Sequence, residues 1–488
     1  MKNNGYDKSK LPELVFESRP DLIELYNTTW QMAFDNIEYP AKPGWLPQMG
    51  CMPGSGKIWQ WDSCFMAIFA KYANNEICTM NNLDNLYRLQ RYDGYISMAY
   101  IIEQEKEAYQ ERINQPLYAW IEWEYYLFTG DDSRFERVYT VLDKYYNWLK
   151  ANRRRNNGLY WFEDTGSCGM DNSPRSGFQT SNLLGSDVCF IDLCCQQALS
   201  AQYLSMIARK LGKKSDEERF AFEYMELNRL INHYMWCERK SFYYDVFTRD
   251  LPELRHNFLS AKTAAAFWPI LSGTANAEQI DGIVKHLLNP DEFWTQHPVP
   301  TLSIDDPNYD PTGGYWLGSV WAPTNYMIAA GLKKSGWNSI SRDLTMKHLD
   351  AMTAVMKNKT FGGIWECYSP ETPSPATKDE NGGLVRDNFV GWSGLGPIAM
   401  LIENVLGLSF DALTNTVSWE IAEPDVHGLR NLHFNGRTIS LLCGRSSVPG
   451  EREIHIETSG EIKVSVTIAG RDEKLSALIS TGRQSLHI

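Results

Sequence analysis

The sequence predicts a barrel of helical hairpins followed by a small β domain. Apolar residues recur at helical spacing through most of residues 1–410, and long loops rich in Gly, Pro and Trp separate these segments. Near the C-terminus the spacing changes to strict alternation. Paired helices with every second loop long are typical of a barrel whose long loops gather at one end and form a pocket. A solenoid would show the same helical spacing, but no repeat of fixed length is visible.

Apolar stripes and capping residues predict the individual helices. One stripe near the N-terminus consists of Leu22, Leu25, Tyr26, Trp30 and Ala33. Ser133 is placed to cap a second helix, and Gly212 to end a third. Further helices are expected near 62–73, 77–90, 115–129, 216–236, 260–272, 276–288, 319–333, 342–358 and 392–406. The long loops are 40–61, 152–185, 289–318 and 359–391.

The C-terminal segment has the pattern of β structure. Ile454 and Ile456 alternate with charged residues, Ser459-Gly460 supplies a turn, and alternation resumes from Ile462 to Ile468. This pattern is typical of a β-hairpin. We therefore expect a helical domain over 1–410 and a small antiparallel β domain over 411–488.

Composition and charge disfavour several classes of function. The 488 residues carry a net charge of −13, which disfavours binding to nucleic acid or to an anionic membrane. Aromatic residues make up 13% of the chain, and stacking on sugar rings is one reason for such a content. The N-terminal sequence resembles no secretory signal, and no run of about 18 apolar residues would span a membrane. Ten scattered cysteines favour free thiols in a reducing compartment, so we expect a cytoplasmic protein.

A short segment, Trp59-Gln60-Trp61-Asp62-Ser63, combines two Trp residues with a carboxylate after a glycine-rich turn. One interpretation is structural: Asp62 caps a helix, and the Trp residues pack in the core. The other is a sugar subsite, in which an aromatic surface packs the ring and the carboxylate accepts hydrogen bonds from its hydroxyls.

Two loops offer candidate catalytic carboxyl groups. Asp171 lies in Gly169-Met170-Asp171-Asn172-Ser173-Pro174-Arg175, where it is either an acid with a raised pKa or the cap of a turn. Glu366, flanked by aromatic residues, is either a surface residue or the base that deprotonates water, with Glu371 and Asp387 as rivals. An inverting glycosidase needs such a pair, about 6.5–9.5 Å apart.

Other aromatic and polar residues fit the same pocket. These are Gln115 and Trp120, then Tyr315, Trp316, Trp321 and Asn325, and finally Trp392. No metal-binding HExxH, no Cys/His zinc spacing and no GxSxG nucleophile motif occurs in the sequence. We therefore expect neither a metal nor an organic cofactor.

Together these segments, in this order, resemble glycoside hydrolase family 63 and its bacterial relatives, including mannosylglycerate hydrolases. The matching segments are Trp59–Ser63, Gln115-Pro116, Gly169–Arg175, Tyr315–Trp321, Glu366–Pro370 and Phe389–Leu395. Two positions depart from the family pattern, since Leu317 replaces the usual Arg and Ser319 the usual Pro.

The resemblance implies an (α/α)6 barrel and an inverting α-glycosidase, acting on an α-glucoside or an α-mannoside. It implies that Asp171 is the general acid and Glu366 the general base. The residues expected to bind substrate are Trp59, Trp61, Asp62, Gln115, Arg175, Tyr315, Trp316, Trp321, Tyr368 and Trp392. A lyase or epimerase on the same fold, and a non-catalytic carbohydrate-binding protein, are the alternatives.

Overall fold

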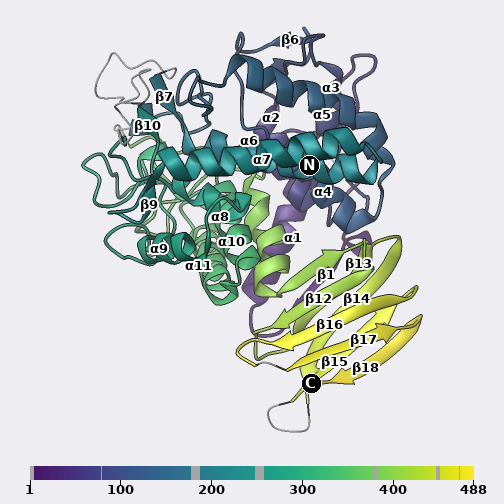
Figure 1. Ribbon diagram of the computed structural model, residues 1–488. Helices are drawn as coiled ribbons and strands as arrows, with labels where there is room; N and C mark the ends of the chain where they lie inside the picture. The colour runs from purple at the N-terminus through teal and green to yellow at the C-terminus, as the bar shows by residue number, and fades with distance from the viewer. Residues whose placement is uncertain are drawn as a thin grey trace.

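The computed structural model describes residues 5–77, 80–176, 187–247, 258–378, 382–446, 451–471 and 473–488. A large helical part carries a β domain at one end, and the chain ends in that domain (Figure 1). Parts of the predicted helix 77–90 and of the predicted loop 152–185 lie outside the described residues. Among the described residues, no helix has the length and apolar character needed to cross a lipid bilayer.

Six helical elements pack side by side in a closed ring. They are α2 (Gln60–Ala70), α4 (Tyr118–Thr129), α6 (Ile191–Lys210), α8 (Trp268–Ser272), α10 (Ala322–Lys334) and η7 (Gly396–Val405). Each contacts the next, and η7 contacts both α10 and α2. Nearly every residue of α6 is buried, which fits an inner position with neighbours on all sides.

A second set of helices covers this ring. It comprises α1 (Pro20–Asp35), α3 (Asn81–Arg88), α5 (Ser133–Asn152), α7 (Lys214–Tyr234), α9 (Ala277–Leu287) and α11 (Asn338–Lys357). The contacts run from α7 to α6, from α11 to α10 and from α1 to η7. These helices are amphipathic, and α1 buries the predicted stripe of Leu22, Leu25, Tyr26, Trp30 and Ala33.

Some helix boundaries differ from the expected ones. Within the predicted helix 260–272, Ala264–Phe267 form a 3₁₀ turn and only Trp268–Ser272 are α-helical. Gly273, with φ 73°, ends this helix in the left-handed conformation. Ser133 is the first helical residue of α5 rather than its cap, which is Asp132.

The β domain consists of two sheets (Figure 1). One sheet has the order β1-β13-β14-β15-β18, and the other β11-β12-β16-β17. The strands of the first are β1 (Glu13–Phe16), β13 (His427–Phe434), β14 (Arg437–Arg445), β15 (Arg452–Thr458) and β18 (Gly482–His487). Those of the second are β11 (Leu408–Asp411), β12 (Thr416–Ile421), β16 (Ile462–Ile468) and β17 (Lys474–Ile479).

Three expectations about this domain need correction. β15 and β16 are the predicted strands, but they belong to different sheets and form no hairpin. The domain is not wholly antiparallel, because β12 and β16 pair in parallel. It also extends beyond 411–488, since β11 begins at Leu408 and β1, from the N-terminus, pairs with β13. Alternation identifies a strand and its buried face but carries no information about its partner.

Candidate active site

A cavity of about 340 Å³ opens where the helices of the ring begin. Asp62 reaches it from the first turn of α2, and Asp171 from the loop between α5 and α6. Tyr315 and Trp316 lie in the 3₁₀ turn before α10, and Glu366 lies in the loop that follows α11. The long loops therefore do gather at one end of the helices, as the sequence predicts.

Aromatic rings form one wall of this cavity. The ring centroid of Trp61 lies 5.7 Å from that of Trp392 and 6.3 Å from that of Trp316. Trp321 stacks on Trp316, with centroids 4.0 Å apart and ring planes 8° apart. Rings fixed in this way present a preformed apolar surface, suited to the C–H face of a sugar.

Asp62 is a carboxyl group buried beside this wall. Its side chain is nearly inaccessible, and its Oδ2 accepts no hydrogen bond from any described residue. Burial, with a smaller contribution from the nearby charges of Glu366 and Asp171, raises the pKa of Asp62 to about 7. A buried oxygen without a partner in a cavity is a ready acceptor for a ligand hydroxyl.

The loop that carries Asp171 is held by several contacts. Thr165 donates a hydrogen bond of 2.6 Å to the Asp171 carbonyl, and Gln115 donates to the carbonyl of Cys168. Asn172 connects the loop to the next one: its Oδ1 accepts from the Trp316 amide at 2.8 Å. Gly169 has φ 76°, and a Cβ there would lie 2.9 Å from the ring of Trp61, so the loop requires glycine.

The carboxyl group of Asp171 has the properties of an acid. It is open to the solvent of the cavity mouth, yet its surroundings remove part of its hydration. This desolvation, followed by the negative charge of Glu366, raises the pKa of Asp171 to about 6. About a tenth of Asp171 therefore carries a proton at pH 7, far more than at its ordinary pKa, and can donate it.

Glu366 has a different environment. Its side chain is buried, and Oε1 accepts hydrogen bonds from Arg386 at 3.0 Å and from the Tyr315 hydroxyl at 3.3 Å. The Arg386 amide donates to Oε2 at 3.2 Å. Burial and the charge of Glu366 raise the pKa of Tyr315, so its hydroxyl remains a donor. A general base must be ionised, and the guanidinium group of Arg386 stabilises the ionised form of the buried Glu366 carboxylate.

The structure brings most of the predicted site residues to this cavity. Those that line it are Trp59, Trp61, Asp62, Asp171, Tyr315, Trp316, Glu366 and Trp392. The rival carboxylates do not: Glu371 accepts a hydrogen bond from Tyr309, and neither it nor Asp387 is among the lining residues.

Four residues expected to bind substrate lie behind the wall instead. Gln115 supports the Asp171 loop, and Trp321 supports Trp316. Tyr368 is buried, and its hydroxyl accepts from the amide of Trp365. Arg175 is fully buried, and its guanidinium pairs with Asp192 and Asp245 at 2.7 Å each. Because Arg175 has these two partners inside the protein, its role in the fold is to fix the end of the Asp171 loop.

The lining residues that sequence reasoning missed include Lys57, Tyr109, Asn114, Lys378 and Arg386. Lys378 and Arg386 follow Glu366 along the same long loop. A buried carboxylate requires a cation near it, and that requirement was the available signal for Arg386. Among the described residues, no group of three or more His, Cys, Asp or Glu side chains is arranged to hold a metal ion.

Two carboxyl groups with different surroundings face one cavity with an aromatic wall. This arrangement is typical of enzymes that hydrolyse glycosidic bonds. A family model agrees with this class. Residues 56–383 match the mannosylglycerate hydrolase MGH1-like glycoside hydrolase domain, and the chain belongs to this family. The matched residues include both Asp171 and Glu366.

Relatives at the sequence level support the same family. An uncharacterized protein of Borreliella burgdorferi is 28% identical over 98% of this chain and 99% of its own length. Mannosylglycerate hydrolase MGH1 of Selaginella moellendorffii is 29% identical over 25% of this chain and 23% of that protein. Mannosylglycerate hydrolase of Thermus thermophilus is 29% identical over 28% of this chain and 30% of its own length. The alignments to the two named hydrolases thus span less than a third of each.

Solved structures share the fold. The family 63 mannosylglycerate hydrolase from Thermus thermophilus, in complex with glucose, matches with a TM-score of 0.58 and 18% identity, over 76% of this chain and 99% of that one. Neutral trehalase from Saccharomyces cerevisiae matches with a TM-score of 0.55 and 14% identity, over 75% and 76% of the two chains. The expected resemblance to family 63 is therefore confirmed.

Proposed function

We propose that this protein is an inverting α-glycosidase that cleaves an α-mannoside or an α-glucoside, with Asp171 as general acid and Glu366 as general base. The observation that carries the proposal is the contrast between the two carboxyl groups of one cavity. Desolvation and a like charge raise the pKa of Asp171 to about 6, whereas Glu366 is paired with Arg386 at 3.0 Å. Acid and base roles follow from such unlike environments.

In this mechanism Asp171 donates its proton to the glycosidic oxygen as the bond to the sugar breaks. Glu366 takes a proton from a water molecule, which attacks the anomeric carbon from the opposite face and inverts its configuration. Asp62 accepts hydrogen bonds from hydroxyls of the glycone, the sugar on the non-reducing side of the bond. Trp61, Trp316 and Trp392 pack against its ring. The closed ring of helices supports an (α/α)6 barrel, and the β domain, which begins at Leu408 and includes β1, lies outside the chemistry.

The charges of the cavity favour an acidic aglycone. Lys57, Lys378 and Arg386 line the cavity together with the carboxyl groups, and the positive charge of Lys378 acts on Asp171. A carboxylate on the leaving group, as in the mannosylglycerate that names the relatives, would meet these cations. Mannosylglycerate is therefore the first substrate to test.

Proton NMR of the reaction tests the proposal. Mannosylglycerate, α-mannosides and α-glucosides are incubated with the wild type, with Asp171→Asn and with Glu366→Gln. We expect the β-anomer to appear first, and each variant to lose about 10²–10⁴-fold in kcat. Glu136→Gln, on the exposed face of α5, is a matched control that removes a carboxylate remote from the cavity. A product of retained configuration, or a variant with near-normal kcat, would contradict the assignment, and sugar binding without turnover would favour a binding protein.

A further inference from the structure

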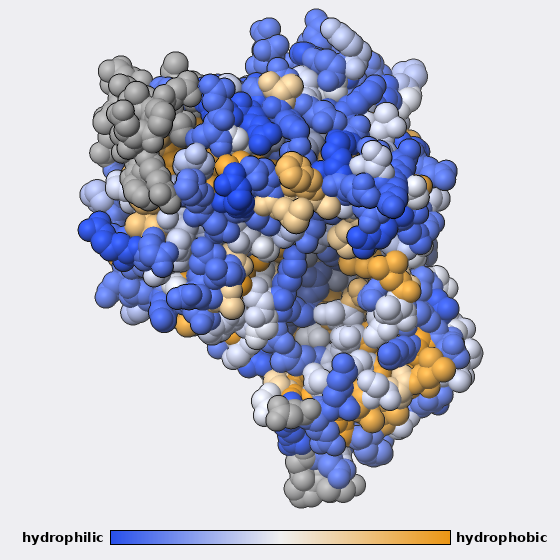
Figure 2. All heavy atoms as spheres, viewed as in Figure 1, coloured by the Kyte–Doolittle hydropathy of each residue, from blue (hydrophilic) through white to orange (hydrophobic). Residues whose placement is uncertain are grey.

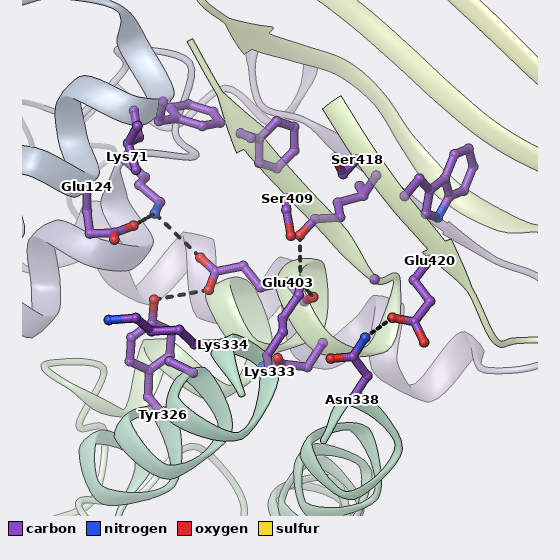
Figure 3. A pocket seen from close by; sticks show the side chains of 18 of the residues that line it. Lys71, Glu124, Tyr326, Lys333, Lys334, Asn338, Glu403, Ser409, Ser418 and Glu420 are labelled. Atoms are coloured by element: carbon purple, nitrogen blue, oxygen red, sulfur yellow. Dashed lines mark hydrogen bonds and ion pairs between the residues drawn. The ribbon is translucent and has the colours of Figure 1, made fainter. Parts of the chain in front are cut away.

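A second cavity, of about 510 Å³, lies where the helical part meets the β domain. Figure 2 shows a hollow at this junction, and Figure 3 shows the side chains that line the cavity. The helices that hold the active site reach it with their other ends. α2 presents Asp62 to the catalytic cavity in its first turn and Lys71, its C-cap, to this one. The 11 residues of α2 span about 16 Å, so the two sites are separate.

The helical wall of this cavity is built around Glu403. Its carboxylate accepts hydrogen bonds from the hydroxyls of Tyr72 at 2.7 Å and Tyr326 at 3.0 Å. Lys71 lies between Glu403 and Glu124, at 3.5 and 3.6 Å (Figure 3). These groups are all held by partners in the protein, so the wall is preformed.

Aromatic side chains complete the helical side of the cavity. Trp120 and Tyr326 stack with their ring centroids 6.3 Å apart. Phe128 packs edge-on against Tyr72, with centroids 4.9 Å apart, and against Phe410 of β11, with centroids 5.2 Å apart. Rings beside carboxylates and hydroxyls are the surroundings that a sugar requires.

The opposite wall is one face of the sheet β11-β12-β16-β17. The strand register places Ser409 beside Ser418 and Ser418 beside Ser465, and all three line the cavity. Ser409 is half-buried and Ser418 is exposed. Val417 and Val464, which alternate with these serines, are buried. The sheet thus turns a row of hydroxyls, rather than an apolar surface, toward the ends of the helices.

The charges of the cavity are nearly balanced. The lining lysines are Lys71, Lys333, Lys334 and Lys474, and the lining carboxylates are Glu124, Glu403 and Glu420. Lys333 donates to the carbonyls of Glu403 and Leu408, and Lys334 to that of Leu271 at 3.1 Å. Burial lowers the pKa of Lys333 to about 8. Because backbone carbonyls and carboxylates already engage Lys71, Lys333 and Lys334, these three lysines offer little surplus charge to an anion.

We propose that this cavity binds a neutral mono- or disaccharide, as a second carbohydrate site distinct from the catalytic one. Its volume lies within the ~300–1,000 Å³ of small-molecule sites. Hydroxyl, carboxylate and ammonium groups together match a ligand whose hydroxyls both donate and accept. A sugar held here would contact α2, α4, α10 and the sheet at once, and so join the β domain to the helices. The proposal does not rest on the hydrolytic function, since the site would bind sugar in a protein without activity.

Calorimetric titration of the full chain tests this site. The protein carries Asp171→Asn to prevent turnover, and the probes are methyl α-D-mannoside, methyl α-D-glucoside, maltose and inorganic phosphate. We expect two sugar sites per chain. Adding Ser418→Trp, which fills the cavity, should weaken one of them by at least about tenfold. Ser480→Trp, on an exposed turn of the same domain, is the matched control and should retain both.

Three results would overturn the proposal: no sugar binding beyond one site, unchanged sugar binding in Ser418→Trp, or loss of phosphate binding alone. The last would identify an anion site. If Ser418→Trp does not fold, Ser418→Val, which suits a strand, replaces it with an expected loss of about fivefold. Neither substitution touches the catalytic cavity. In an otherwise wild-type chain, hydrolysis at saturating substrate should therefore continue, which separates failure of this proposal from failure of the catalytic one.

Discussion

Replacing Asp62 by Asn should stabilise the protein, and more so as the pH rises. The structure moves the pKa of Asp62 from 3.8 to about 7. In the unfolded chain the carboxyl ionises above its ordinary pKa, whereas in the fold it stays protonated until about pH 7. Ionisation of the unfolded state therefore costs stability progressively between about pH 4 and pH 7. Roughly three pKa units, at about 1.4 kcal/mol each, give about 4 kcal/mol at pH 8.

Asn has nearly the same shape and does not ionise, so Asp62→Asn removes this cost. The assay is urea-induced unfolding of both proteins at pH 4 and at pH 8. The difference in free energy of unfolding should be small at pH 4 and reach a few kcal/mol in favour of Asn at pH 8. Asp281→Asn, on the exposed face of α9, controls for the substitution itself. A difference that is equal at both pH values would refute the reasoning, as would a variant less stable at pH 8. We expect Asp62→Asn to lose sugar binding as well, since Asp62 lines the cavity.

Three further perturbations test the site. Because Asp171 must be protonated to act as the acid and its pKa in the free protein is raised to about 6, kcat/KM should fall as the pH rises, with an apparent pKa of about 6 in a pH–rate profile. Arg386→Met leaves the buried Glu366 without its cation, so steady-state kinetics should show kcat reduced by at least about tenfold. A kcat near that of the wild type would show that Arg386 has no part in the reaction. Arg175→Met leaves Asp192 and Asp245 buried without a counter-charge, so the free energy of unfolding should fall by about 3–5 kcal/mol in a denaturant titration. An unchanged free energy of unfolding would show that these ion pairs contribute nothing to stability.

Local sequence determined most of the helices and identified the residues proposed to be catalytic. Spacing at 3.6 residues identified the buried stripe of α1, because the side chains that must avoid water lie on one face of that helix. Trp61, Asp62, Asp171 and Glu366 were found from short motifs, because each lies in a loop or first helical turn whose residues adjoin it in the chain. The nine cysteines that the structure describes are free, as their scattered spacing predicts.

The tertiary structure alone decided which side chains meet. Arg386, the partner of Glu366, follows it by 20 residues, and Arg175 turned inward to two aspartates that are 17 and 70 residues distant. The pairing of strands could not be predicted from the sequence either. β12 and β16 are joined by backbone hydrogen bonds, and the backbone groups that make them are the same in every sequence. The second cavity exists only because the ends of the helices face the hydroxyl row of a sheet from the other end of the chain. Sequence periodicity indicates which face of a helix or strand is buried. Long-range packing determines which residues contact that face and which contact the polar face.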